Sequence, residues 1–328
     1  MRRIGIAILL AMAASIALRG QTPRVHQFMP DKFYTTYSFA HPPALRINPG
    51  DRVVTKTIDA AGVDWTGKQV SSGGGNPETG PFFIEGAEPD DMLIVTFQRM
   101  ETNRATGYSS SLLAPYTIDP QFIAARVDRE PKRMTWTIDK AKGIAFVDSS
   151  DLKPSHLEVP LKPMLGCVGV APARKEAITT TTPGAWGGNM DYVGVAAGAK
   201  VMLPVYEPGA LLFIGDGHAR MGEGEPVGTG IETSMDVEFT VDLVKKKPIA
   251  WPRLENDTHL MVLGSARPLI EAFQHATTEM QKWLMADYGF SERGASMFMG
   301  QAVEYEIANV VDPNFTVVAK MRKSLLPR

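Results

Sequence analysis

Short runs of apolar and β-branched residues, separated by Gly, Pro, Asn and Asp, occupy the chain from residue 27 to residue 247. In DVEFTVDLV, Val237, Phe239 and Val241 alternate with polar residues, which is the period of a half-buried strand. Similar runs are LRI and RVVTKTIDA around a Pro-Gly-Asp turn, MLIVTFQRM, RMTWTID, GIAFVD, LEVPL and ALLFIGD. Many short strands joined by turns predict a mainly β fold with a sandwich or barrel-like core.

The pattern changes to a helical one near residue 264, and no helix of ordinary length is expected before it. Apolar residues near helical spacing are Leu269, Ile270, Phe273, Met280 and Leu284. Gly289 is a typical C-terminal stop, and Ser291 begins a second helix-like stretch. A turn and a strand close the chain. We therefore expect a β-rich body over residues 21–263 and an α+β part over residues 264–328.

The N-terminus has the layout of a secretory signal peptide. Arg2 and Arg3 precede an apolar run from residue 4 to residue 18, which is short for a membrane span. A signal peptide over residues 1–20 predicts export to the periplasm or the medium, and an uncleaved membrane anchor is the alternative. Later segments contain no apolar run of membrane-spanning length, so we expect no stable membrane insertion after cleavage.

Charge and cysteine content narrow the class of protein further. The chain has 328 residues and a formal net charge of -2, so no basic field predicts a nucleic-acid partner. Small neutral molecules suit this charge balance better. The one cysteine, Cys167, excludes an intramolecular disulfide. Flanked by glycines in LGCVGVAPA, it is either a nucleophile on a turn or a small buried apolar residue.

The segment IGDGHARMGEGE concentrates acidic groups and an imidazole among four glycines. Asp216 and His218 alternate with glycine directly after a buried strand, and Glu223 and Glu225 follow on a second glycine-rich turn. Carboxylate and imidazole groups are ligands for Zn²⁺, and a carboxylate-rich set also accepts Ca²⁺. The spacing is equally consistent with a divalent metal site and with a hydrogen-bonded polar turn. For a metal site, Zn²⁺ is the preferred ion and Ca²⁺ is the alternative.

Two other segments carry candidate polar residues. GGNMD places Asn189 and Asp191 on an irregular glycine loop, where ordinary turn hydrogen bonding is the alternative. Glu85 lies in the apolar segment PFFIEGA, where a charge needs a partner unless it faces solvent at a sheet edge. Taken alone, Glu85 is better explained as a surface residue.

Taken together, these motifs resemble the acetamidase/formamidase family. NPETGPFFIEGAEPDDMLIV, LGCVGVAPA, GGNMD, LPVYEPGALLFIGDGHARMGEGE and GTGIETSMDVEF occur in that family's order, and the C-terminal helical segment is similar as well. The resemblance runs from about residue 46 to the C-terminus. It implies a β-sandwich-like body with a smaller α+β part, and hydrolysis of short aliphatic amides to carboxylate and ammonia. It also favours a homo-oligomer, a dimer or larger.

The resemblance also implies roles for particular residues. His218, Asp191, Asp59 and Asp216 become the candidate metal ligands, Asp59 through the T-x-D motif of the first strands. As a mechanistic hypothesis, we expect Glu225 to be the base that takes a proton from water, with Glu85 as its substitute, and Asn189 or a glycine-loop N–H to donate to the oxyanion. A covalent route through Cys167 is the alternative mechanism. A non-catalytic exported β-sandwich that binds a small polar ligand and a structural metal ion is the alternative function.

Overall fold

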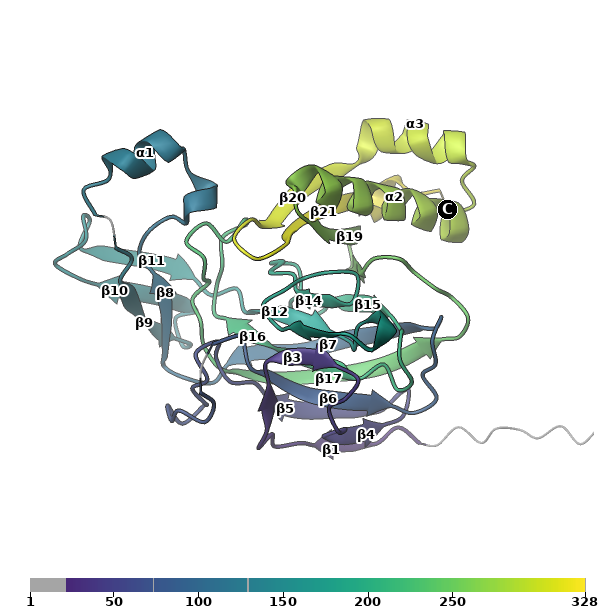
Figure 1. Ribbon diagram of the computed structural model, residues 1–328, viewed down its shortest axis with the longest axis horizontal. Helices are drawn as coiled ribbons and strands as arrows, with labels where there is room; N and C mark the ends of the chain where they lie inside the picture. The colour runs from purple at the N-terminus through teal and green to yellow at the C-terminus, as the bar shows by residue number, and fades with distance from the viewer. Residues whose placement is uncertain (1–21, 73, 129, 328) are drawn as a thin grey trace, which may run out of the picture.

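Two β-sheets pack against each other in the computed structural model, which describes residues 22–72, 74–128 and 130–327 (Figure 1). The larger sheet has nine strands in the order β1-β5-β17-β7-β15-β18-β19-β21-β20. Its strands are β1 (Val25–Gln27), β5 (Arg52–Lys56), β17 (Met235–Val244), β7 (Met92–Thr102), β15 (Lys200–Pro204), β18 (Arg253–Glu255), β19 (His259–Ala266), β21 (Phe315–Arg322) and β20 (Glu304–Asn309).

The second sheet has the order β14-β12-β16-β6-β2, and β4 adds to β6 in parallel. Its strands are β14 (Gly187–Asn189), β12 (Met164–Gly169), β16 (Leu212–His218), β6 (Glu78–Ile84), β2 (Phe33–Tyr34) and β4 (Leu45–Ile47). A two-stranded sheet joins β13 (Ala177–Thr179) to β3 (Thr36–Ser38).

The main core lies between the two large sheets. Val237, Phe239 and Val241 are fully buried, so the predicted alternation along β17 is confirmed. Phe239 meets Phe82 of the second sheet edge to face, with ring centroids 5.2 Å apart. Contacts of this kind between sheets make the body a sandwich, and the mainly β fold predicted from the sequence is confirmed.

A four-stranded sheet projects from the body (Figure 1). We call this sheet, together with the segment between its strands, the arm (residues 106–160). Its strands are β8 (Thr106–Ser110), β9 (Arg133–Asp139), β10 (Ile144–Asp148) and β11 (His156–Pro160). Between β8 and β9 lie the 3₁₀ helix η1 (Pro115–Thr117) and the short helix α1 (Pro120–Ala125). The other 3₁₀ helices are η2 (Ala173–Lys175) and η3 (Lys323–Leu325).

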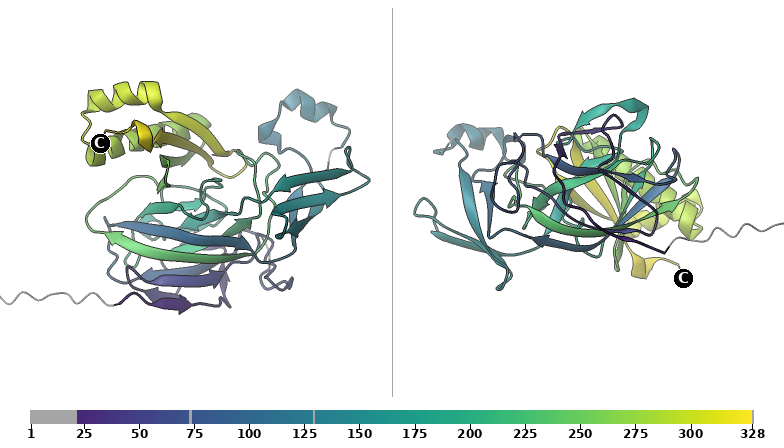
Figure 2. Two further views of the ribbon diagram at one scale, coloured as in Figure 1. Left: turned by 180° about the vertical axis from the view of Figure 1, so that it is seen from behind. Right: turned by 90° about the horizontal axis from the view of Figure 1, so that it is seen from below.

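The two predicted C-terminal helices are present. Helix α2 (Leu269–Tyr288) ends where Gly289 takes a positive φ of 70°, as the sequence predicts. Helix α3 (Glu292–Ala302) begins with Ser291, whose side chain accepts a hydrogen bond from the N–H of Gly294. Both helices lie beside β19, β20 and β21 (Figure 2). Met280, Trp283 and Leu284 of α2 are buried in this second core.

The expected domain boundaries do not all correspond to breaks in the structure. The boundary at residue 264 falls inside β19, and the strands that follow continue the nine-stranded sheet. The predicted signal peptide lies outside the described residues and stays a prediction. Over the ranges that the structure describes, no helix is long and apolar enough to cross a membrane.

Asp51 fastens the first strand to the body. Its carboxylate accepts hydrogen bonds from the backbone N–H groups of Arg24 and Asn48 and contacts His26 Nε2, each at 2.9 Å. Burial by itself would raise the pKa of Asp51, but these hydrogen bonds outweigh it and lower the pKa to about 2. The ionised carboxylate therefore stabilises the fold at neutral pH.

We expect Asp51→Ala to lower the free energy of unfolding by about 1–2 kcal/mol at pH 7. Because the folded pKa lies below the unfolded one, this stabilisation is full above pH about 4 and is lost as the pH falls toward 2. Urea unfolding at a series of pH values measures the difference between the two proteins. Asp31→Ala, at an exposed site on the same segment, is the control. A difference that stays constant down to pH 2 would contradict the assignment.

Candidate active site

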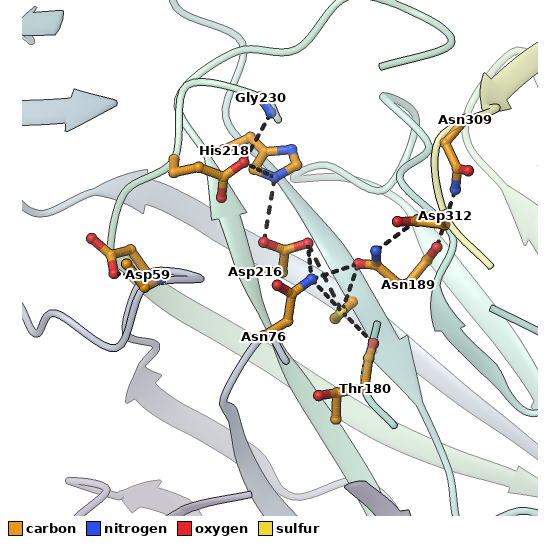
Figure 3. A network of polar contacts seen from close by, with 12 residues as sticks. Asp59, Asn76, Thr180, Asn189, Asp216, His218, Gly230, Asn309 and Asp312 are labelled. Carbon is orange, nitrogen blue, oxygen red and sulfur yellow. Dashed lines mark hydrogen bonds and ion pairs between the residues drawn. The ribbon is translucent and has the colours of Figure 1, made fainter. Parts of the chain in front are cut away.

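Three neighbouring strands of the second sheet bring the candidate residues together. In β16, Asp216 and His218 are two positions apart, so both side chains project from one face of the sheet. The strand register places Cys167 of β12 between Gly215 of β16 and Asn189 of β14. The GGNMD motif (residues 187–191) and the GDGH motif (residues 215–218), which are separated in the sequence, therefore meet at one place (Figure 3).

Glycines line the site because the acidic side chains approach the backbone closely. A Cβ atom on Gly166 would lie 2.3 Å from Asp191 Oδ1 and 2.5 Å from Asp216 Oδ2. A Cβ atom on Gly230 would lie 2.5 Å from Cγ of the His218 ring. Any larger residue at these two positions would displace a polar side chain of the cluster. The abundance of glycine here is explained by packing.

His218 is the centre of the cluster. Its Nε2 atom lies 3.0 Å from Glu232 Oε1 and 3.4 Å from Asp216 Oδ1. Two overlapping groups each place three ligand atoms within 4.8 Å of one another: Asp191, His218 and Glu225 form one, and Asp216, His218 and Glu232 form the other. All five side chains are buried. We call these five residues the His218 cluster.

Three acids of the His218 cluster have a strained backbone. The φ angles of Asp191, Asp216 and Glu225 are 44°, 53° and 49°. Residues other than glycine rarely adopt the left-handed region, and such strain persists where the surrounding structure holds it. The fold therefore turns three carboxylates inward at a cost in local stability, which is typical of a functional site.

In the part of the chain that the structure describes, His218 is the only basic side chain that pairs with the four acids of the His218 cluster. Among the described residues, no Lys or Arg side chain forms an ion pair with its four acids. Both carboxylate oxygens of Asp191 and the Nδ1 atom of His218 are buried without a hydrogen-bond partner in the described part of the chain, whereas Nε2 of His218 faces Glu232 and Asp216. Burying carboxylates in this state is costly. A set of buried carboxylates around an imidazole fits a divalent cation.

The protonation equilibria reflect this burial. Burial, followed by repulsion from nearby carboxylates, raises the pKa values of Asp191 and Glu225 well above the usual range. Burial would lower the pKa of His218, but the charges of Glu232 and Asp216 outweigh it and raise the pKa. Burial also raises the pKa of Glu232, to about 7. In the protein alone, the cluster therefore retains protons that a bound cation would displace.

An amide network supports the His218 cluster on the side of β14. Asn76 Nδ2 donates to Asp216 Oδ2 at 3.0 Å and to Asn189 Oδ1 at 3.1 Å. Asn189 Nδ2 in turn donates to Asp312 Oδ2 at 2.7 Å, and Asn309 Nδ2 donates to the Asn189 carbonyl (Figure 3). Asn189 thus lies beside the His218 cluster and, through Asn76, connects Asp216 to Asp312 in the loop after β20, while its role as an oxyanion donor stays a prediction.

Cys167 is fully buried beside this network. Its Sγ atom donates to Asn189 Oδ1 at 2.9 Å. Burial, followed by the charges of Glu78 and Asp216, raises the pKa of the thiol well above its usual value. The reactive form of cysteine is the thiolate, and this environment disfavours it. The site therefore gives no support to the covalent alternative through Cys167.

Two residues that the sequence placed in the site lie elsewhere. Glu85 is 40% exposed and forms a two-point ion pair with Arg46, so the solvent-facing explanation is correct and its role as a substitute base is wrong. Asp59 is fully buried, but one of its oxygens accepts a hydrogen bond from Arg104 Nη2 at 2.6 Å and the other accepts from the N–H groups of Ala61 and Val63. With its lone pairs engaged, Asp59 is outside both candidate ligand groups.

Sequence reasoning missed three acids near the site. Glu232 belongs to the His218 cluster, although it stands in the quoted motif GTGIETSMDVEF. Glu78 is fully buried with both oxygens unpaired in the described structure, and Asp312 contacts Asn189 from the loop between β20 and β21. Glu78 and Glu232 each follow a turn and precede small residues. Asp312 precedes a proline and looks like an ordinary turn residue.

Comparison with known proteins agrees with this architecture. The model of the Acetamidase/Formamidase family matches residues 170–325. The crystal structure of an acetamidase from Yersinia enterocolitica superposes with a TM-score of 0.80 at 32% identity, over 94% of this chain and 95% of that one. A predicted acetamidase/formamidase from Thermoanaerobacter tengcongensis gives a TM-score of 0.78 at 26% identity, over 92% and 97%.

A curated relative from Schizosaccharomyces pombe, named as a formamidase, is 24% identical over 225 residues. That match covers 52% of this chain and 55% of the relative, so the chain spans about half the length of the curated relative. The near-complete match to the Yersinia structure defines the class of protein. The chain belongs to the acetamidase/formamidase family, a class of amide hydrolases.

Proposed function

We propose that this protein hydrolyses a short aliphatic carboxamide, of the formamide or acetamide kind, to the carboxylate and ammonia. The observation that carries the proposal is the His218 cluster: four buried acids converge on one imidazole, and no Lys or Arg of the described residues pairs with them. Amide hydrolysis needs a deprotonated water, stabilisation of the oxyanion and a proton for the departing nitrogen. Relatives named as acetamidases and a formamidase support this choice of substrate.

The donor set fits a divalent cation, with Zn²⁺ preferred because of the imidazole and Ca²⁺ as the alternative. We assign the cation to Asp216, His218 and Glu232, since the carboxylates of Asp216 and Glu232 already face Nε2 of His218. A cation bound there supplies positive charge that polarises a carbonyl oxygen and favours deprotonation of a water. Asp191, the remaining ligand implied by the family resemblance, belongs to the adjoining group with Glu225.

Glu225 is the residue that we assign to proton transfer. It is buried, its carboxylate lies within 4.8 Å of ligand atoms of His218 and Asp191, and no ion pair engages it within the described residues. Its carboxylate accepts a proton from water and returns it to the leaving nitrogen, which restores the starting state. Asn189 uses one amide N–H to hold Asp312 and has a second one to donate to the oxyanion.

Ammonia release from formamide, acetamide and propionamide by the purified protein tests this proposal. We expect turnover of all three, falling as the acyl chain lengthens, because the site is enclosed and its acids are buried. Release should be stoichiometric with carboxylate. If the protein is loaded with Zn²⁺ or Ca²⁺ and still releases ammonia from none of the three amides, the proposal is contradicted. That result would favour the non-catalytic alternative, in which the cation only stabilises the fold.

A further inference from the structure

The backbone at Glu225 has an unfavourable conformation, and hydrogen bonds within its own loop are not the only contacts that hold it. Glu225 has a φ of 49° and directly precedes Pro226. A left-handed backbone is rare for a residue with a side chain, and a following proline restricts it further. Within the loop, Glu225 N–H donates to Gly222 and Gly228 N–H donates to Glu225. Two such local bonds do not fix where the loop lies relative to His218.

The loop is fastened to the rest of the molecule on two sides. On the C-terminal side, Gly224 N–H donates to Ala308 O at 2.9 Å. On the other side, the arm contacts the carbonyl of Pro226 through two groups: Ala114 N–H donates to it at 2.7 Å, and Thr117 Oγ1 lies 3.0 Å from it. The single Thr117 hydroxyl proton is shared between this carbonyl and the Ala114 carbonyl, which is 2.8 Å away. The carbonyl of Pro226, the residue that follows Glu225, is therefore held by residues that are more than 100 positions away in the sequence.

The segment of the arm that provides these donors is itself docked on the body. Arg267 lies between two aromatic rings, 4.8 Å from the centroid of Tyr116 in η1 and 4.3 Å from that of Phe315. Its Nη2 atom also donates to the carbonyl of Asp312 at 3.3 Å. In Figures 1 and 2, η1 reaches from the arm toward the loop after β16 and the loop between β20 and β21.

We propose that Ala114 and Thr117 of the arm are positioning residues for the active site: they hold Pro226 and thereby fix the carboxylate of Glu225 relative to His218. This inference rests on the proposed function, because it assigns the proton transfer to Glu225. Neither residue is among those of the His218 cluster. Loosening the anchor should therefore lower kcat and leave KM nearly unchanged, since a misplaced base slows the chemical step.

Two substitutions remove the donors, and each has a matched control. Ala114 has a φ of -65°, which proline adopts, so Ala114→Pro removes the N–H without opposing the backbone of residue 114. Ala114→Ser keeps that N–H. Thr117→Val removes the hydroxyl at nearly constant shape, and Thr117→Ser keeps it. Should Ala114→Pro fail to fold, the Thr117 pair decides the question alone.

We expect kcat to fall about threefold to tenfold in Thr117→Val and at least as much in Ala114→Pro, with KM within about twofold and both serine variants similar to wild type. Amide hydrogen exchange over residues 222–230 should be faster in the two donor-removing variants only. Unchanged kcat, an effect on KM alone, or equal losses in the serine controls would overturn the inference. If the wild type releases no ammonia, the proposed function fails. In that case the hydrogen-exchange data alone show whether the arm holds the loop, and unchanged exchange over residues 222–230 in Thr117→Val overturns the inference.

Discussion

His218→Asn should remove both the bound cation and amide hydrolysis. His218 belongs to both candidate ligand groups, so no alternative set of three ligands is left among the described residues once the imidazole is gone. Loss of the cation removes several kcal/mol of transition-state stabilisation, and we expect kcat/KM on acetamide to fall by about a thousandfold or more. Elemental analysis of the purified variant measures the cation, and ammonia release measures the activity.

Controls separate the loss of the cation from general damage to the fold. His156→Asn changes an exposed histidine on the arm and should keep both the cation and the activity. Chelation of the wild-type protein should reproduce the loss seen in His218→Asn, and added Zn²⁺ should restore activity to the wild type only. A His218→Asn protein that retains full activity would contradict the role of the cluster. Activity that survives complete removal of the cation would contradict the role of the metal.

Glu225→Gln should lower kcat on acetamide by roughly 10²–10⁴-fold and leave the cation in place. Glutamine has nearly the same shape as glutamate but cannot take up the proton of an attacking water. If the cation is bound by Asp216, His218 and Glu232, removing the charge of Glu225 does not remove a ligand. Steady-state kinetics and elemental analysis on the same sample measure the two quantities.

Two further variants test the assignment of Glu225. Glu223→Gln changes an exposed acid two residues away on the same loop, and we expect activity close to that of the wild type. Glu232→Gln should lose the cation as well as the activity. If Glu225→Gln loses the cation and Glu232→Gln retains it, Glu225 is the ligand and Glu232 is the candidate for proton transfer. Equal activity of Glu225→Gln and wild type would contradict a proton-transfer role for Glu225.

Local signals in the sequence were sufficient for most secondary structure. The stop at Gly289 and the alternation of Val237, Phe239 and Val241 depend on neighbours within a few positions, and both are confirmed. The same holds for the Asp216–His218 pair, since two residues on one strand must share a face. Partners that are distant in the sequence cannot be predicted in this way. Glu85 pairs with Arg46 and Asp59 pairs with Arg104, each about 40 positions away, and no local pattern indicates either pair.

The sequence by itself determined the mainly β architecture, the C-terminal helices, the family and the segment that carries His218. These features follow from residue periodicity, glycine stops and motif order, which the chain records locally. Only the tertiary structure decided which carboxylates face His218, because strand register and loop anchoring join Glu225, Glu232 and Asp191 across the fold. The free energy of a buried charge depends on the groups around it, and these are set by packing.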